Sequence, residues 1–351
     1  MASGVAILSW LLLFATGAIA SCAHGTHLRP RQEGKVEVDN FGYTALTGPL
    51  NWVSLDPANI LCATGSHQSP INIVEGQFSL VPAANLGIAV PDFTEGAEFE
   101  NLGTTVEVIA QGGTMSVNHV EFGLQQFHFH LPSEHLDDGV SHAMEMHMVW
   151  ESAAGDVAVV GVYIDVENSD SATEEVVQDP AEIVAGKAAV ASEAEAGATT
   201  PARKRSIRTF RRDRAESALK AEPAKKKKRA ATTLLETVFS SIDAITKPGT
   251  VTTTEPLVMS ELVDLINSGE FQSYTGSLTT PPCSEDVLWF VSTQTLQVTA
   301  KSFGRVRDVI GFNARFPQNT LGQPNLLAVA SANMASPHVQ LATVAHQLGV
   351  H

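Results

Sequence analysis

The residues best suited to metal chemistry are histidines in two short apolar segments, residues 126–130 and 145–149. On an extended strand, side chains two positions apart point to the same face, so His128 and His130 share one face. His147 has the equivalent position in the second segment. If the two strands are neighbours, the three imidazoles converge on one point.

Three neutral imidazoles with an open fourth position are typical of a catalytic zinc site, whereas structural zinc sites are closed by four protein ligands. The three cysteines lie elsewhere in the sequence, so we expect none of them to supply the fourth ligand. Metal-bound imidazoles also need hydrogen-bond acceptors, and Gln126 and Glu145 share the strand faces of the histidines. The alternative is that the histidines are satisfied core or surface side chains; the same-face Glu145 favours ligation.

These histidines lie in a region whose pattern predicts many short strands. From Phe41 to Tyr163, segments rich in Val, Ile, Phe and Thr alternate with Gly, Pro, Asn and Asp. The strands expected there and later are 104–109, 114–117, 125–130, 145–150, 157–164, 287–292 and 296–299. One amphipathic helix is predicted between Leu234 and Ile245, and a second from Ser260 as N-cap to a stop at Gly269.

The charge of the chain is unevenly distributed. The formal net charge over 351 residues is −16, yet thirteen of the 22 Lys and Arg residues lie in 201–230. The acidic remainder is a poor nucleic-acid binder, and we expect no nucleic-acid partner. Residues 166–231 have hardly any large apolar side chain, which predicts a disordered or partly helical insertion. Its basic half is suited to contact an anionic surface, although a solvated charged segment is the simpler interpretation.

The N-terminus predicts secretion. Residues 5–20 form an uncharged apolar run that ends in Ala18-Ile19-Ala20, as in a signal peptide over 1–20. A membrane anchor is the alternative, but a span needs about 20 apolar residues, so we expect no stable membrane span. In a minority alternative, residues 19–22 act as a lipoprotein box and a lipid on Cys22 anchors the protein.

The remaining boundaries follow from composition. A mobile leader is expected over 21–40, one folded domain over 41–325 interrupted by the insertion, and a frayed tail over 326–351. In an oxidising compartment two of the three cysteines are expected to pair. Cys62 and Cys283 lie in well-patterned segments and form the natural pair; two separate buried thiols are the alternative.

Taken together, the motifs resemble the α-class carbonic anhydrases, in particular secreted microbial or fungal ones. The matching blocks occur in order at 41–43, 48–52, 68–73 (QSPINI), 126–130 (QFHFH), 133–135 (SEH), 145–147 (EMH), 276–283 (GSLTTPPC), 289 and 313–315. The resemblance implies a mainly β (α+β) fold, in which a large, twisted, mostly antiparallel central sheet with short peripheral helices holds zinc in a conical cleft.

The resemblance also implies a reaction and the residues that carry it out. The reaction is reversible hydration of CO₂ to bicarbonate and a proton by zinc-bound hydroxide, with weak esterase activity. His128, His130 and His147 would ligate Zn²⁺. Thr279 would accept a hydrogen bond from the hydroxide and donate one to Glu134.

Further residues take roles from the same resemblance. The apolar wall that receives CO₂ would be Val149, Val159, Leu278, Val287 and Trp289, with ordinary core packing an equal interpretation for Val287. The polar wall that orders water would be Tyr43, Asn101 and Thr280. The hydrogen-bond partners of the ligands would be Gln126, Glu145 and the backbone carbonyl of Asn313. Cys62 and Cys283 match the disulfide of the extracellular members.

Two other functions compete with catalysis. A catalytically silent relative would use the fold as a binding module, but such relatives usually lack a ligand histidine, and all three are present here. A protein that acts through its basic insertion would bind anionic surfaces, and this function can coexist with catalysis.

The segment 100–105 often supplies a proton-shuttle histidine in this family, and this chain has Thr104 there. Threonine does not titrate near neutral pH. We therefore expect proton release to limit turnover, so that imidazole-type buffers raise kcat of CO₂ hydration without changing kcat/KM. A kcat that does not depend on buffer concentration in stopped-flow assays would contradict this expectation.

Overall fold

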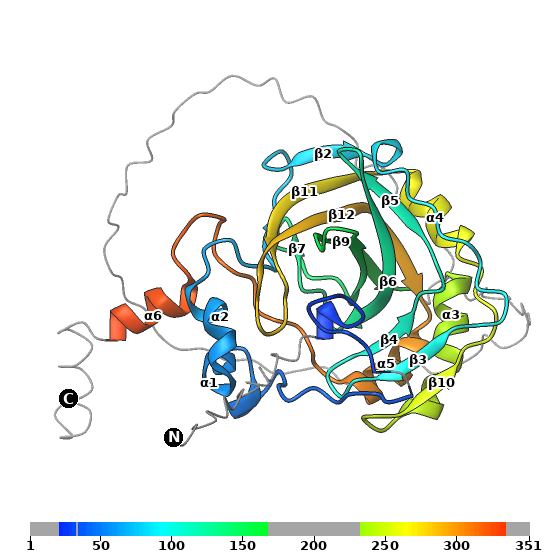
Figure 1. The fold of residues 1–351 in the computed structure, drawn as a ribbon, viewed down its shortest axis with the longest axis horizontal. Coiled ribbons are helices and arrows are strands. Elements are labelled where there is room, and N and C mark those ends of the chain that lie inside the picture. Colours follow the sequence, from blue (N-terminus) through cyan, green and yellow to red (C-terminus); the bar gives the residue numbers. More distant parts are fainter. Residues whose placement is uncertain (1–20, 33, 168–231, 335–351) are drawn as a thin grey trace, which may run out of the picture. The chain divides into compact units, whose positions relative to one another are not determined.

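The computed structural model describes residues 21–32, 34–167 and 232–334 (Figure 1). The predicted signal peptide, most of the predicted insertion (168–231) and residues 335–351 lie outside the described residues. Residues 166 and 167, which we expected to belong to the insertion, instead continue from a strand of the sheet.

A ten-stranded, mostly antiparallel sheet dominates the fold, as predicted. Its order is β10-β3-β4-β6-β8-β9-β12-β11-β2, with β5 beside β6 and only β9 and β12 parallel among the described pairs of this sheet. The strands are β2 (Ser79–Pro82), β3 (Glu98–Asn101), β4 (Val106–Ile109), β5 (Thr114–Val117), β6 (Val120–His130), β8 (Met144–Ser152), β9 (Val157–Val166), β10 (Val251–Thr253), β11 (Glu270–Ser277) and β12 (Glu285–Val298). A separate pair joins β1 (Asn72–Ile73) to β7 (Leu136–Asp137).

Short helices surround this sheet (Figure 1). They are α1 (Trp52–Leu55), α2 (Leu61–Thr64), α3 (Thr233–Ser240), α4 (Ser260–Asn267), α5 (Ala300–Ile310) and α6 (Leu326–Met334), with 3₁₀ turns at Ser21–Ala23, Ala45–Thr47, Pro57–Ile60, Ala83–Asn85 and Ile242–Ile245. Among the described residues, no helix has the length and hydropathy needed to cross a membrane.

The two central strands β6 and β8 separate the main core from the histidines. Phe127 and Phe129 are buried on the core face, where the Phe129 ring lies 4.8 Å from that of Phe239 in α3. His128 lies directly opposite His147 in the β6–β8 register. The predicted alternation of the two strands is therefore confirmed.

Several predicted boundaries differ from the structure. Ser260 is the first residue of α4 rather than its N-cap, which is Met259, and the Asp92 carboxylate accepts the Ser260 N–H. The two strands expected at 287–292 and 296–299 are one strand, β12, whose pairing with β9 shifts register between Val291 and Thr295. The polar residues between the two predicted strands, which suggested a break, lie at this irregularity.

The predicted frayed tail is wrong for residues 326–334, which form α6. The side chain of Asn325 explains where the helix begins, because its Oδ1 accepts the N–H of Leu327 and its Nδ2 donates to the carbonyl of Gly65. The cap thus also ties the helix to the chain that follows α2.

The predicted Cys62–Cys283 disulfide is confirmed. It lies in a small core with Phe41 and Trp52. The Arg315 guanidinium stacks 5.6 Å from the Trp52 ring and donates to the Cys62 carbonyl. The bridge therefore ties the N-terminal part of the domain to the loop that follows β11.

The disulfide spans 221 residues of sequence. Crosslinking a loop this long restricts the unfolded chain, so replacing both cysteines by alanine should lower the free energy of unfolding by roughly 2–5 kcal/mol. Urea denaturation followed by tryptophan fluorescence measures this loss. A reductant should destabilise the natural sequence and leave the double variant unchanged; equal stability of the two proteins without reductant would contradict the prediction.

Candidate metal centre

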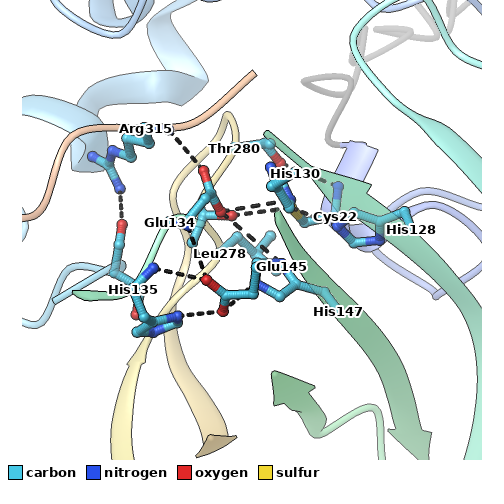
Figure 2. A network of polar contacts seen from close by, with 12 residues as sticks. Cys22, His128, His130, Glu134, His135, Glu145, His147, Leu278, Thr280 and Arg315 are labelled. Carbon is cyan, nitrogen blue, oxygen red and sulfur yellow. Dashed lines mark hydrogen bonds and ion pairs between the residues drawn. The ribbon is translucent and has the colours of Figure 1, made fainter. Parts of the chain in front are cut away.

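Two of the predicted ligand histidines are oriented by acceptors on their Nδ1 atoms. His128 Nδ1 lies 2.9 Å from Gln126 Oε1, and His130 Nδ1 lies 2.8 Å from the carbonyl oxygen of Asn313. Both rings are buried and present Nε2 to a common centre (Figure 2). The acceptors thus fix the nitrogen that each ring offers to a metal.

His147 presents its other nitrogen. Its Nε2 lies 2.9 Å from Glu145 Oε1, while its buried Nδ1 has no hydrogen-bond partner among the described residues. A buried polar atom without a partner is costly, and a metal ion would satisfy it. The predicted His128, His130 and His147 therefore converge, with Nε2, Nε2 and Nδ1 directed inward.

Glu145 is the hub of this network. Its Oε2 accepts the backbone N–H groups of Glu134 and His135 at 2.9 and 2.8 Å, and its Oε1 also lies 2.6 Å from His135 Nδ1. Burial alone would raise the pKa of Glu145, but the adjacent His135 and His147 lower it well below its usual range. Glu145 therefore remains a carboxylate that fixes both the His147 ring and the turn that follows β6.

Sequence reasoning gave His135 no role of its own. Its Nε2 lies 2.7 Å from the Tyr274 hydroxyl in β11, so the ring links Glu145 to a strand distant in sequence. The only signal in the sequence was its place in the SEH block next to Glu134.

The three predicted ligand histidines are held in the neutral form. Burial lowers the pKa of His130 to about 4 and that of His128 well below its usual range, and the neighbouring imidazoles add to the effect for His128. Burial also lowers the pKa of His147, against the opposing effect of Glu145. Neutral imidazoles are the metal-binding form of histidine.

Glu134 and Thr279, which are distant in sequence, meet beside this cluster. Glu134 Oε2 lies 3.5 Å from His130 Nε2, and its Oε1 accepts the Arg315 backbone N–H at 2.8 Å. Burial raises the pKa of Glu134 to about 7, while His147, the Thr279 hydroxyl and the Arg315 N–H oppose this shift. Arg315, whose role the sequence analysis missed, is buried and donates to the carbonyl of Ser69.

The five residues expected to form the apolar wall are brought together. Val149, Val159, Leu278, Val287 and Trp289 belong to one buried cluster on the histidine side of the sheet. The Trp289 ring lies 4.9 Å from the His147 ring, and its Nε1 donates to the Ser277 carbonyl. The wall is therefore in contact with the metal centre.

The polar wall is assembled only in part. Thr280 lies at the centre, and the Tyr43 ring packs on Trp52 with its hydroxyl buried. Asn101 does not share this environment, because its Nδ2 donates to the Ile245 carbonyl and its Oδ1 accepts the Gly103 N–H. The predicted role of Asn101 is therefore wrong, since both of its polar atoms hold loops.

Cys22 contradicts the expectation that all three cysteines lie away from the histidines. Its Sγ lies 3.4 Å from His128 Nε2 and 3.2 Å from Thr279 Oγ1 (Figure 2). Burial, followed by the charge of Glu134, raises the pKa of the Cys22 thiol to about 12. A lipid on this sulfur, the minority alternative, would require Cys22 to leave its position.

The donor atoms fit a tetrahedral metal. Ligand atoms of Cys22, His128, His130 and His147 all lie within 4.8 Å of one another. Zinc bonds of about 2.0–2.1 Å to nitrogen and 2.3 Å to sulfur imply donor separations of about 3.3–3.6 Å. The Cys22 sulfur lies 3.4 Å from His128 Nε2, within this range, and 4.0 Å from His130 Nε2, slightly beyond it. The site therefore suits a zinc-like ion, with either three or four protein ligands.

Comparisons with known proteins agree with this arrangement. The eukaryotic-type carbonic anhydrase family model matches residues 47–195 and 217–324. A carbonic anhydrase from Nostoc sp. is 27% identical over 282 residues, which is 80% of each chain. The structure of a fungal α-carbonic anhydrase from Aspergillus oryzae superposes with a TM-score of 0.64 at 34% identity, covering 84% of this chain and 99% of that one. An α-carbonic anhydrase from Thermovibrio ammonificans, solved with the inhibitor sulfanilamide, gives a TM-score of 0.57 at 25% identity and covers 82% and 98% of the two chains.

Glu145→Gln tests whether the hub supports metal binding. The amide would direct a donor at N–H groups that now meet a carboxylate, so we expect the dissociation constant for Zn²⁺ to rise roughly 10–100-fold. Competition with a chromophoric chelator measures it. Glu121→Gln in the same pair of strands changes an exposed carboxylate and is the control; equal affinities of the two variants would refute the role of Glu145.

Proposed function

Because the chain belongs to the eukaryotic-type carbonic anhydrase family, whose reaction is the hydration of CO₂, we propose that it carries out this reaction with a zinc ion held by His128, His130 and His147. The observation that carries the proposal is the convergence of three neutral imidazoles whose outward nitrogens are all occupied by acceptors. Zinc bound there would act as a Lewis acid and lower the pKa of a bound water to about 7.

The first contribution of the protein to the reaction is that it holds the three histidine rings in fixed orientations. Gln126, Glu145 and the Asn313 carbonyl each hold one ring, and all three acceptors are buried with the rings they contact. A site fixed in this way does not need to reorganise during the reaction. These acceptors also increase the basicity of the imidazoles they contact.

Thr279 and Glu134 orient the nucleophile in this proposal. The Arg315 backbone N–H holds Glu134 so that its other oxygen is free to accept a hydrogen bond from the Thr279 hydroxyl. The Thr279 oxygen then has only lone pairs to offer, so it accepts a hydrogen bond from the attacking oxygen and directs that oxygen's lone pair toward CO₂. Alignment of this kind is a large part of the rate that enzymes gain from positioning.

The buried wall that contains Val149, Leu278 and Trp289 would receive CO₂. CO₂ has no net charge and no hydrogen-bond donor, so an apolar surface beside the nucleophile binds it without competing for the polar groups. The same wall would tolerate small esters, which supports the weak esterase activity that we expect.

Secretion is also part of the proposal. The Cys62–Cys283 disulfide supports an oxidising compartment, and the apolar run at 5–20 supplies a signal for export. The alternative of a silent binding module has no support from the residues present, because no ligand histidine is replaced. Contact of the basic segment with an anionic surface stays a separate prediction, since that segment lies outside the described residues.

Stopped-flow CO₂ hydration with zinc quantification tests the function. Because the Cys22 thiol lies beside the histidines, the variants are compared in a Cys22→Ala background. Thr279→Val should retain about one zinc per chain but lose about a hundredfold in kcat/KM, since the nucleophile is no longer oriented. His147→Ala should lose both zinc and activity.

The two variants differ in what they report. If the Cys22→Ala protein binds zinc at full occupancy but does not hydrate CO₂, carbonic anhydrase activity is excluded and a binding module is favoured. Loss of zinc in Thr279→Val would mean that the hydroxyl has a structural role instead.

A further inference from the structure

The N-terminal segment fills the place where substrate would approach the metal. In Figure 1 the dark-blue start of the described chain, Ser21–Ala23, lies within the curve of the sheet next to β6. The Cys22 backbone N–H donates to Thr280 Oγ1 at 3.2 Å, and Cys22 and Ala23 belong to the same buried cluster as the apolar wall. The predicted mobile leader over 21–40 is therefore wrong for this part of the segment.

We propose that Cys22 is a fourth protein ligand to the metal and that residues 21–31 form a built-in plug, which closes the site as a His₃Cys centre until the plug is withdrawn. The effect of closure on catalysis rests on the proposed function. Ligation by Cys22 can be tested without an activity assay. The carrying observation is the sulfur, which faces the inward-directed Nε2 atoms of His128 and His130 and the hydroxyl of Thr279.

The segment is held by a series of polar contacts and ion pairs rather than by the thiol alone. His24 Nδ1 contacts the carboxylate of Glu107 in β4, and Arg31 lies between Glu98 and Glu100 of β3. Burying a carboxylate is costly without a partner, and Glu107 is fully buried here. The plug therefore supplies His24 and Arg31 to acidic side chains of β3 and β4, and one of these, Glu107, lies opposite His128 in the β4–β6 register.

Arg29 fixes the other end of the plug. Its guanidinium lies 2.6 Å from Asp39, donates to the Glu37 carbonyl, and is 4% exposed. Thr104, at the place where the family often has a shuttle histidine, donates its hydroxyl to the same Asp39 carboxylate. Arg29 of the segment and Thr104 are therefore joined through one carboxylate.

A fourth thiolate has a direct chemical consequence. Zinc with four protein ligands is typical of closed, structural sites, and a reactive site keeps one position for water. With Cys22 bound, the nucleophile has no position on the metal and CO₂ has no access to its wall. The protein would be latent in this form and active once residues 21–31 move away.

Because Cys62 and Cys283 form the disulfide, Cys22 is the only free thiol of the chain. A thiol reagent therefore reports on Cys22 alone. In the zinc-loaded protein we expect slow modification, and in the chelated protein fast modification, because the metal holds the sulfur. A thiol that is merely packed in the core would react at one rate in both forms, and that result would overturn the proposal.

Cobalt substitution tests the bond itself. Co²⁺ in the natural sequence should give an intense thiolate-to-metal charge-transfer absorption in the near ultraviolet. Cys22→Ser, which keeps a polar group of similar size, and Cys22→Ala should both bind Co²⁺ without this band. Leu28→Ala, in the same segment but partly exposed, is the matched control and should keep it. An identical spectrum for the natural sequence and both Cys22 variants would refute ligation.

Activity then tests latency. Zinc-loaded Cys22→Ala should hydrate CO₂ on the order of tenfold faster than the natural sequence or Leu28→Ala, because activity follows the fraction of molecules with an open position. The plug would be refuted if the natural sequence shows the charge-transfer band while Cys22→Ala is active but no faster than the natural sequence. A band with no activity in any variant would refute the proposed function and leave the His₃Cys ligand set established.

Discussion

The register between β6 and β8 is the constraint on which the metal centre depends. It places His128 opposite His147 and sends the intervening side chains to the main core. Because side chains on a strand alternate with a period of two, a slip of one residue would turn phenylalanines toward the metal and bury the imidazoles among apolar groups. The register is thus fixed by two different environments, one apolar and one polar, on opposite faces of the same strands.

Packing on the apolar face of β6 and β8 stabilises the register. Phe129 packs against Phe239 of α3, and the buried methionines of β8 complete the same surface. On the polar side Glu145 accepts hydrogen bonds that close the turn after β6 and orient His147 in one step. Core packing and ligand orientation are therefore coupled, since neither face of the two strands can move without the other.

The extent to which the sequence predicted this arrangement follows from the range of the interactions. His128, His130 and His147 were accessible because strand periodicity is local and needs only the neighbouring residues. Thr279 and Glu134 were accessible only through the resemblance to a family, because their meeting depends on how distant segments pack. Asn101 shows the limit of such a transfer: the position matches, yet its side chain is used by the loops at Ile245 and Gly103.

Residues 21–31 were missed for a related reason. They have no apolar periodicity, so the pattern that indicates a packed helix or strand is absent. Their order comes instead from single polar contacts to residues far along the chain, such as that of His24 with Glu107. Polar contacts of this kind have no local sequence signal, because each partner appears as an ordinary charged residue.

Metal binding and the position of this segment are thermodynamically linked. If the Cys22 thiolate binds the metal, metal binding stabilises the bound position of the segment. By reciprocity, every contact that stabilises this position also increases the affinity for the metal. The linkage also means that opening requires more than breaking one sulfur–metal bond. The buried Arg29–Asp39 pair and the partners of Glu107 and Glu100 must be separated together and then solvated. In this proposal, the polar contacts and ion pairs therefore determine how much free energy is needed to release residues 21–31. The thiol determines whether the bound segment closes the fourth position on the metal.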